Sequence, residues 1–589
     1  MEASTLSING VIQRNTLLRI PYFQRRYVWG EEDWERFAID MESTLDSERY
    51  YFLGAIILKE ENVTVEDRRR GIGRKQLVID GQQRLTTLAI YMKVLHMMTA
   101  KSDDYSNQYL QATDVKDPVI IHSCDDMPQF KKIMHLDSLI DIPDNTNISK
   151  AYNYFKKFLK ERQRQGINLN DLLNTVNASV TFVVISLSQD DDEQQIFDTI
   201  NSLGVPLTTG ELMKNFLYEA QDEEAYKNSW KIIFDTDEAR EFWESDASKS
   251  RQSKSKDNTT IERFFHAFVR IKMWDFKDDL SNSQKKNFVK MENIFTTCKA
   301  FVEKFGMNKQ DLANEIIEYA KLFRKHLGSD VLDIRVPQHF GIKRISCLIN
   351  ATKSYTVIPY VLFILKTVDS EAERNKIFAY LETYLMRRVL SKSTNNNYSD
   401  LFSENLIGQR VQTYDDLKQY IEGKSDSSSL AMPQLSTIRK SLNNNKFDEI
   451  TSRIIYYLYE TKLSKTSEGT FNEGYNYYIC EQFMPKSCAA ADVNWPPYYD
   501  KDEEDNRREM IATLGNFFLL DVINEKELKN CHNEPYSIKL SKLKSWSTNI
   551  RSNQILNTIN KWDEKNITSR NNLLVQALSE NIWAIEKND

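Results

Sequence analysis

The sequence predicts a predominantly helical α+β protein that is divided into several domains. Gly (17 residues) and Pro (12 residues) are scarce in a chain of 589 residues, and so few breakers favour long helical segments over a β-sandwich. A chain of this length exceeds what one hydrophobic core supports, so we expect roughly two to four domains. Hydrophobic residues (41%) and charged residues (28%) occur in the proportions of a globular protein.

The first segment is predicted to contain a β-hairpin followed by a helix. Residues 50–58 (YYFLGAIIL) and 76–79 (QLVI) are rich in strand formers, and the polar stretch 66–75 lies between them. After residue 79 the apolar positions take on a helical period, so a helix begins near Gln82 or Gln83.

Further along the chain, one more strand is predicted and then mostly helices. Residues 180–185 (VTFVVI) are β-branched and apolar. Thr208 and Glu211 have the spacing of a capping box, which predicts a helix that runs through Leu217. Residues 225–420 contain amphipathic stretches and are predicted to be mainly helical.

Three domains are expected from this organisation. Their predicted ranges are 1–225, 226–422 and 430–589. The stretch 423–429 (GKSDSSS) has the composition of a flexible linker, which places the last boundary there.

Charge and cysteine usage narrow the class of protein. A net charge of −7 excludes a generally basic protein that coats nucleic acid, so any DNA contact has to use local basic patches. The six cysteines are scattered without a C-x-x-C pair, which argues against a zinc ribbon and suits a reducing cytosol. Neither a secretory signal nor an apolar run of ~20 residues is present. We therefore expect a cytoplasmic protein with no membrane partner.

Residues 80–84 (DGQQR) are predicted to form a phosphate site at a strand-to-helix corner. The N-terminus of a helix offers unpaired N–H groups and partial positive charge, and Gly81 lets a ligand approach the backbone closely. Arg84 supplies a planar fork for phosphate, and Asp80 can hold a metal ion or orient water. The alternative is an ordinary turn in which Asp80 caps the helix and Arg84 is solvated.

Five strings accompany this corner. They are 20–29 (IPYFQRRYVW), 52–55 (FLGA), 77–88 (LVIDGQQRLTTL), 197–208 (FDTINSLGVPLT) and 211–216 (ELMKNF). In this order and spacing they resemble the N-terminal domain of the GmrSD-type, modification-dependent restriction enzymes.

The resemblance implies a ParB/sulfiredoxin-like fold in which D-G-Q-Q-R binds and hydrolyses a nucleoside triphosphate, with Mg²⁺ as the expected metal. The implied catalytic residues are Asp80, Gln83 and Arg84. The implied nucleotide-binding residues are Gln24, Arg25, Arg26, Gly81, Gln82, Asn201 and Lys214. Tyr27 and Trp29 would lie beside the site, with core packing as the alternative for both. For Lys214 the alternative is a plain surface charge.

The last segment resembles the C-terminal domain of the same family, a His-Asn-His (ββα-metal) nuclease module. The strings that carry this resemblance are 478–485 (YICEQFMP) and 514–520 (LGNFFLL). Family members have E-H-I-x-P where this chain has E-Q-F-M-P, so Gln482 occupies the position of the general base. A carboxamide does not take up a proton near neutral pH, and loss of a general base removes a factor of ~10²–10⁴ in rate. We therefore expect a degenerate nuclease module.

Other positions of the module still match the family pattern. Asn516 and Asn524 are candidate metal ligands, and Lys539 is a candidate DNA contact, with satisfaction of backbone groups as the alternative. His532 is the only histidine of this segment, and we expect it to be an exposed loop residue.

A second candidate DNA surface is the basic stretch between the two strands of the first hairpin. Five cations gather in what is predicted to be one exposed loop: Arg68, Arg69, Arg70, Arg74 and Lys75.

Three functions are consistent with these observations. The first is a DNA-directed anti-phage restriction protein controlled by nucleotide hydrolysis, with modified phage DNA as the target. The second is a non-hydrolysing sensor that acts through a partner nuclease. The third is an active metal nuclease despite the missing histidine. A partner protein or a homo-oligomer is compatible with each.

Overall fold

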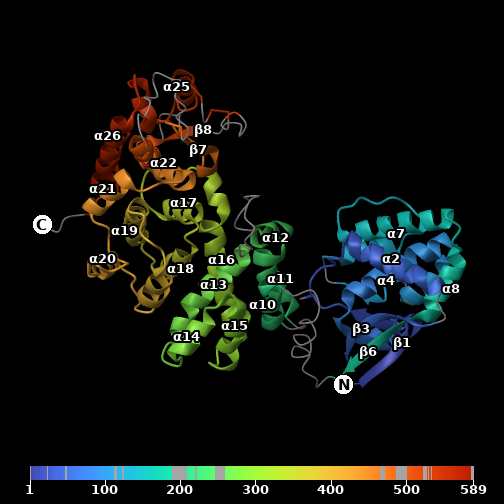
Figure 1. Cartoon of the computed structure of the whole chain (residues 1–589). Coiled ribbons are helices and arrows are strands. Elements are labelled where there is room, and N and C mark those ends of the chain that lie inside the picture. The colour runs from blue at the N-terminus through green and yellow to red at the C-terminus, as the bar shows by residue number, and fades with distance from the viewer. Residues whose placement is uncertain are drawn as a thin grey trace. The chain divides into compact units, whose positions relative to one another are not determined.

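The structure is a computed structural model that describes residues 2–22, 24–46, 49–111, 116–122, 125–188, 208–218, 222–245, 259–463, 471–485, 501–521, 527, 530–531 and 534–585. The chain forms two compact units, Met1–Lys231 and Ile232–Asp589. The first combines a sheet with helices, and the second is mainly helical (Figure 1). The predicted α+β fold with a predominance of helix is confirmed.

A six-stranded mixed sheet organises the first unit. Its strands are β1 (Glu2–Ser7), β2 (Thr16–Arg19), β3 (Tyr51–Glu60), β4 (Arg74–Asp80), β5 (Ile120–Ile121) and β6 (Val180–Leu187). They lie in the order β1-β6-β3-β4-β2-β5. The predicted hairpin is confirmed as the antiparallel pair β3–β4, and β6 pairs with β3 in parallel.

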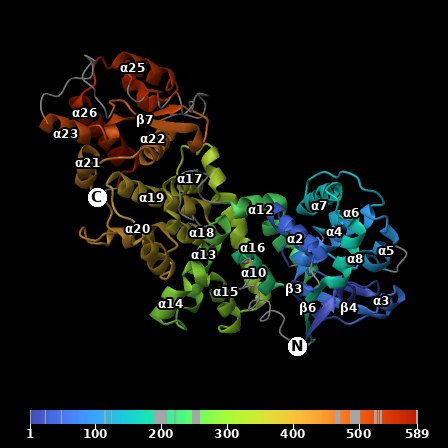
Figure 2. The ribbon, with the colours of Figure 1, turned by 45° about the vertical axis from the view of Figure 1, so that its right-hand side comes forward.

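The first unit also contains helices. They are α1 (Ile8–Val11), α2 (Glu31–Ser43), α3 (Val65–Arg69), α4 (Gln82–Met98), α5 (Ser102–Tyr109), α6 (Met127–Met134), α7 (Asn147–Arg164), α8 (Leu169–Ser179), α10 (Thr209–Leu217) and α11 (Glu223–Asn228). Figures 1 and 2 show α2, α4, α7 and α8 on the same side of the strands. Helix α4 is buried nearly all round, as expected of a central helix.

Two helix starts confirm the sequence predictions. Helix α4 begins at Gln82. Helix α10 begins after Thr208, whose hydroxyl accepts the backbone N–H of Glu211 at 3.2 Å, while the Glu211 carboxylate accepts the backbone N–H of Thr208 at 2.8 Å. This is the predicted capping box.

The second unit contains most of the remaining helices and one hairpin. Its helices are α12 (Asp237–Glu244), α13 (Thr260–Lys272), α14 (Asn282–Phe288), α15 (Ile294–Glu303), α16 (Lys309–His326), α17 (Ile342–Thr352), α18 (Ile358–Thr367), α19 (Glu371–Leu390), α20 (Tyr414–Glu422), α21 (Leu435–Asn444), α22 (Glu449–Leu463), α23 (Lys501–Met510), α25 (Tyr536–Ser545) and α26 (Glu564–Val575). A 3-10 turn, η3 (Met273–Phe276), and two π-helices, η7 (Asp400–Ile407) and η12 (Gln576–Ile582), also belong to it. Strands β7 (Tyr478–Gln482) and β8 (Phe517–Asp521) pair antiparallel, and α25 follows them.

Buried polar contacts join the helical part of this unit to its C-terminal part. Arg344 of α17 pairs with Glu382 of α19 at 2.7 Å, and both side chains are fully buried. Trp583, close to the C-terminus, donates its indole N–H to the same Glu382 carboxylate at 3.1 Å. Arg387 donates to the carbonyl oxygens of Ser579 and Trp583. The helical region and the C-terminal region therefore share one interior.

The stretch predicted as a flexible linker is anchored in this interior. Arg388 donates to the carbonyl oxygen of Ser429 at 2.8 Å, and the Tyr384 hydroxyl donates to that of Leu430 at 3.0 Å. The first unit ends at Lys231, beyond the predicted domain end at residue 225.

Over the described ranges, the longer helices all lack the sustained apolar stretch that crossing a bilayer requires.

Candidate functional site

The corner between β4 and α4 has the geometry that the sequence predicts. Gly81 adopts a φ of 97°, a left-handed conformation that side chains other than glycine rarely adopt. A Cβ at this position would lie 2.4 Å from Cγ2 of Ile56, so the glycine is also required by packing. The strand therefore turns sharply into the helix, and the first N–H groups of α4 lie directly beside Asp80.

Asp80 and Arg84 form an ion pair across this corner. Nη2 of Arg84 lies 2.9 Å from Oδ2 of Asp80, and the two side chains are 26% and 27% exposed. Arg84 also lies against Gly54 of β3, because a Cβ on Gly54 would be 2.4 Å from Nη1 of Arg84. The guanidinium is thus held in place yet reachable from solvent, and neither side chain is an unattached surface charge.

Three glutamines hold a short segment, residues 24–28, over the corner; we call it the strap. Nε2 of Gln24 donates to the carbonyl oxygens of Val78 and Ile79 at 2.6 and 2.8 Å. Nε2 of Gln82 donates to the carbonyl oxygen of Arg25 at 2.8 Å.

Gln83 makes the most complete of these contacts. Its Nε2 donates to the carbonyl oxygen of Arg26 at 3.1 Å, and its Oε1 accepts the backbone N–H of Val28 at 2.9 Å. All three glutamine side chains are buried. In this structure the amides of all three glutamines bind the protein backbone and position the strap. A catalytic role for Gln83 and nucleotide contacts of Gln24 and Gln82 stay predictions.

Tyr27 is a core residue. Its hydroxyl lies 2.7 Å from Oγ1 of Thr87 on α4 and accepts the indole N–H of Trp34 at 2.8 Å. Burial raises the pKa of Tyr27. Trp29 is partly buried and packs against the same core. Core packing, the alternative considered for both residues, is what the structure shows.

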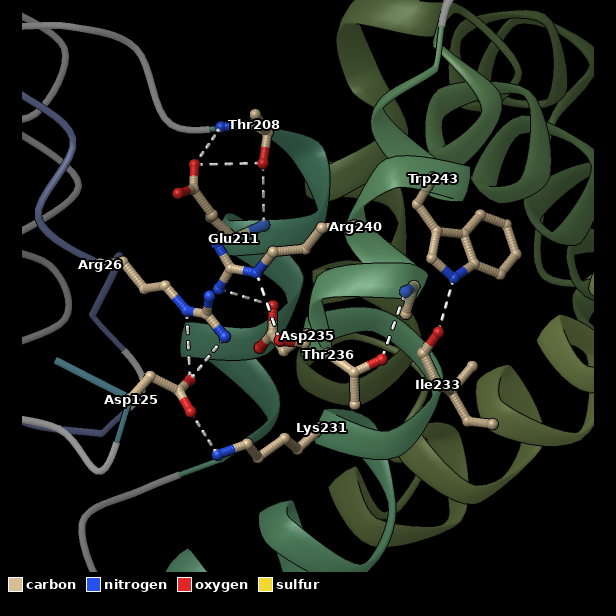
Figure 3. A network of polar contacts seen from close by, with 11 residues as sticks. Arg26, Asp125, Thr208, Glu211, Lys231, Ile233, Asp235, Thr236, Arg240 and Trp243 are labelled. Carbon is tan, nitrogen blue, oxygen red and sulfur yellow. Dashed lines mark hydrogen bonds and ion pairs between the residues drawn. The ribbon is translucent and has the colours of Figure 1, made fainter. Parts of the chain in front are cut away.

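The two arginines of the strap differ in their surroundings. Arg26 pairs with Asp125 at 3.2 Å, and Asp125 also pairs with Lys231 at 2.6 Å, so one carboxylate bridges two cations (Figure 3). Arg25 is half-buried and forms no ion pair with any residue that the structure describes. Arg25 is therefore the strap cation that remains available to an anionic ligand.

Lys214 and Asn201 were also predicted to bind nucleotide. Lys214 lies in α10 and is buried. The alternative of a plain surface charge is therefore wrong for Lys214. Asn201 lies outside the described residues.

The predicted DNA-binding loop of the first hairpin is not a set of free cations. Lys75 pairs with the buried Asp67 at 3.4 Å, Arg74 with Glu60 at 3.4 Å, and Arg70 with Asp117 at 3.3 Å. Arg68 and Arg69 lie in the short helix α3 and are exposed. Arg69 also lies 3.9 Å from Glu66. The prediction that all five cations lie in one exposed loop was therefore wrong, because Arg74 and Lys75 belong to β4 and four of the five cations have an acidic partner.

The C-terminal hairpin and α25 form the ββα arrangement that the resemblance implies. Gln482 ends β7, and its Nε2 donates to the carbonyl oxygen of Ile511 at 2.9 Å. Asn516 is fully buried; its Oδ1 accepts the N–H groups of Met484 and Trp562, and its Nδ2 donates to the carbonyl oxygens of Met484 and Ile511. Asn516 therefore satisfies backbone groups, which was the alternative to its role as a metal ligand. Neither the oxygen nor the nitrogen of its amide is left to bind a metal.

Lys539 is also internal, so its prediction as a DNA contact is corrected. Its ammonium lies 2.9 Å from Oε1 of Glu481, and both side chains are buried. Asn524 and His532 lie outside the described residues. Within the described ranges, no three His, Cys, Asp or Glu side chains group as metal ligands.

Two regions of the chain match models of known protein families. Residues 8–218 match the family described as GmrSD restriction endonuclease, N-terminal domain, and residues 432–577 match GmrSD restriction endonucleases, C-terminal domain. The chain belongs to the GmrSD restriction endonuclease family. A search of curated proteins finds no match to it. The N-terminal match contains the Asp80–Arg84 corner, and the C-terminal match contains the β7–β8 hairpin and α25. A GmrSD protein acts on DNA in restriction, and that role is the coarse function of this chain.

Sequence reasoning missed two residues of the site. Gly54 belongs to the FLGA string, and its φ of 119° and its contact with Arg84 explain why a glycine interrupts a strand. Asp125 bridges Arg26 and Lys231 without any local motif that marks it.

Proposed function

We propose that this GmrSD protein binds a nucleoside triphosphate at the Asp80–Arg84 corner and uses its hydrolysis to control restriction of DNA. The observation that carries the proposal is the ion pair itself: it is partly open to solvent, lies at the N-terminus of a buried helix, and is flanked by Gly54 and Gly81. A phosphate at this place would meet the helix N-terminus and an arginine together.

The chemistry assigned to each residue follows from its contacts. Arg84 uses one nitrogen toward Asp80, which leaves other N–H groups of its fork for phosphate oxygens. Asp80 contributes a carboxylate at the corner, so it would hold Mg²⁺ or orient the attacking water. Arg25 would add a second cation near the phosphates. Mg²⁺ would neutralise phosphate charge as hydrolysis proceeds.

The C-terminal module is proposed to recognise DNA with weak or absent cleavage. Gln482 carries no group that takes a proton at neutral pH, and its amide is engaged with the backbone at Ile511. DNA cutting by this protein would then depend on another nuclease.

A matched set of variants tests the N-terminal proposal. Asp80→Ala and Arg84→Ala should lower the rate of nucleoside triphosphate hydrolysis by about 10²–10³-fold, the effect of removing a group that stabilises transition-state charge. Arg74→Ala removes an exposed ion pair on the same hairpin and serves as the control. Equal phosphate release by the wild type and both site variants would refute the hydrolase.

A non-hydrolysing nucleotide sensor is the second candidate. It is favoured by the engagement of Gln24, Gln82 and Gln83 with backbone, because an amide that binds backbone is not available to orient water. For a sensor, Arg84→Ala would weaken nucleotide binding although the wild type releases no phosphate.

A further inference from the structure

A cavity of about 340 Å³ lies in the helical part of the second unit, apart from every site considered above. Arg270 at the end of α13 and Trp274 of η3 form one wall, and α14 contributes Lys285 and Lys286 to another. The third wall is the π-helix η7, a kind of turn that occurs frequently at functional sites. Its volume is at the small end of the ~300–1,000 Å³ range of ligand pockets.

Charges of both signs line this cavity. Lys285 and Lys286 come from α14, whereas Asp400 and Glu404 come from η7. Within the described ranges none of the four forms an ion pair. Lys285 lies over the ring of Trp274, 5.5 Å from its centroid. A ligand with an anion at one end and hydrogen-bond donors at the other would match both walls.

Two side chains of one wall are held in place. Trp274 is only 9% exposed. Arg270 donates to Ser399 at 2.6 Å and to His266 at 3.1 Å.

We infer that this cavity binds a small phosphorylated sugar, up to the size of a nucleoside monophosphate. The phosphate contacts Lys285 and Lys286. The sugar hydroxyls donate to Asp400 and Glu404, as carboxylates do toward ribose in nucleotide sites. The two carboxylates disfavour a ligand that carries phosphate at both ends.

The inference is independent of nucleotide binding at the Asp80–Arg84 corner. That corner belongs to the first unit, and the cavity belongs entirely to the second. Variants of Asp80 or Arg84 should leave binding in the cavity unchanged, so failure of one proposal does not imply failure of the other.

Calorimetric titration of the full-length protein tests the cavity with ribose 5-phosphate and the four nucleoside 5′-monophosphates as probes. At least one probe is expected to bind with a single site per chain, and unphosphorylated ribose is expected to bind at least about tenfold more weakly. Lys286→Glu should weaken binding by about 10–100-fold, because it replaces an attraction by a repulsion at the phosphate. Lys290→Glu changes an exposed lysine just beyond α14 and should leave affinity unchanged.

The inference is overturned if no probe binds at millimolar concentration. It is equally overturned if Lys286→Glu and Lys290→Glu have the same effect, or if ribose binds as well as its phosphate.

Discussion

The ammonium of Lys539 lies 2.9 Å from the carboxylate of Glu481, with both groups buried between the β7–β8 hairpin and α25. Glu481 directly precedes Gln482, so the residue beside the vacant general-base position is fixed to the helix of the ββα module. The scaffold that would orient a catalytic histidine is therefore retained although the histidine is not.

Breaking this buried pair should destabilise the protein strongly. Lys539→Ala removes the cation that lies against the buried Glu481 carboxylate and should lower the free energy of unfolding by about 3–5 kcal/mol. Replacing both partners, as in Lys539→Met with Glu481→Leu, should be much less destabilising than the single change. Chemical denaturation measures both. Wild-type stability of Lys539→Ala would show that the two charges do not depend on each other.

Restoring an imidazole should restore proton transfer on this scaffold. Gln482→His is expected to increase DNA cleavage in Mg²⁺ or Mn²⁺ by about 10²-fold or more over the wild type. Gln482→Asn keeps a carboxamide and is the matched control. Cleavage by the wild type as fast as that by Gln482→His would contradict our account of this position.

The contact between Gly54 and Arg84 should be sensitive to a single methyl group. Gly54→Ala adds a Cβ 2.4 Å from Nη1 of Arg84, so the guanidinium must move, and nucleotide affinity should fall by about tenfold or more. Gly166→Ala is the control, because Gly166 has a similar positive φ of 98° but no atom within 4 Å of its Cβ position. Both changes introduce backbone strain of about 1 kcal/mol or more. Only the first should alter nucleotide binding.

The strap should loosen when its glutamine is shortened. Gln83→Ala removes the acceptor of the Val28 N–H and the donor to the Arg26 carbonyl oxygen. We expect faster hydrogen exchange at Val28 and a loss of about 1–3 kcal/mol in the free energy of unfolding. Exchange at the backbone N–H of Tyr27, which binds Asp126 at 2.7 Å, should change less. Unaltered exchange at Val28 would exclude Gln83 as the residue that holds the strap.

Buried histidines should make stability fall in mild acid. Burial lowers the pKa of His122 to about 3, whereas an unfolded histidine titrates near ~6.5. Between these values the unfolded chain binds the extra proton, so the free energy of unfolding falls as pH is lowered from ~6.5, by up to about 1.4 kcal/mol per pH unit. His122→Asn should flatten that dependence in denaturation curves recorded from pH 7 to pH 5. An unchanged slope would contradict the burial of His122.

The corner could be predicted from sequence because each of its parts is local. A strand, a glycine with positive φ and a helical period lie within about one turn of one another, and Arg84 reaches Asp80 across that turn. The roles of Gln82 and Gln83 could not be predicted in this way. Their partners belong to the strap, which is far away in sequence. The sequence also does not distinguish a glutamine whose amide binds backbone from one whose amide binds a ligand.

The basic stretch and Lys539 show that the sequence does not reveal whether a cationic side chain has an acidic partner. The sequence shows that cations cluster, but Asp117 and Glu481, which neutralise Arg70 and Lys539, lie dozens of residues away. Burial of a lysine depends on the packing of a whole domain, so no local sequence pattern indicates it.

The shared carboxylate of Glu382 has a practical consequence for dissecting the protein. Severing the chain after Glu422 would separate Glu382 from Trp583 and Arg387 from its carbonyl acceptors near the C-terminus. Each fragment would then expose apolar surface and polar groups that are buried against the other fragment in the intact protein. The nuclease-like fragment should therefore be insoluble when expressed alone and soluble when the two fragments are produced together.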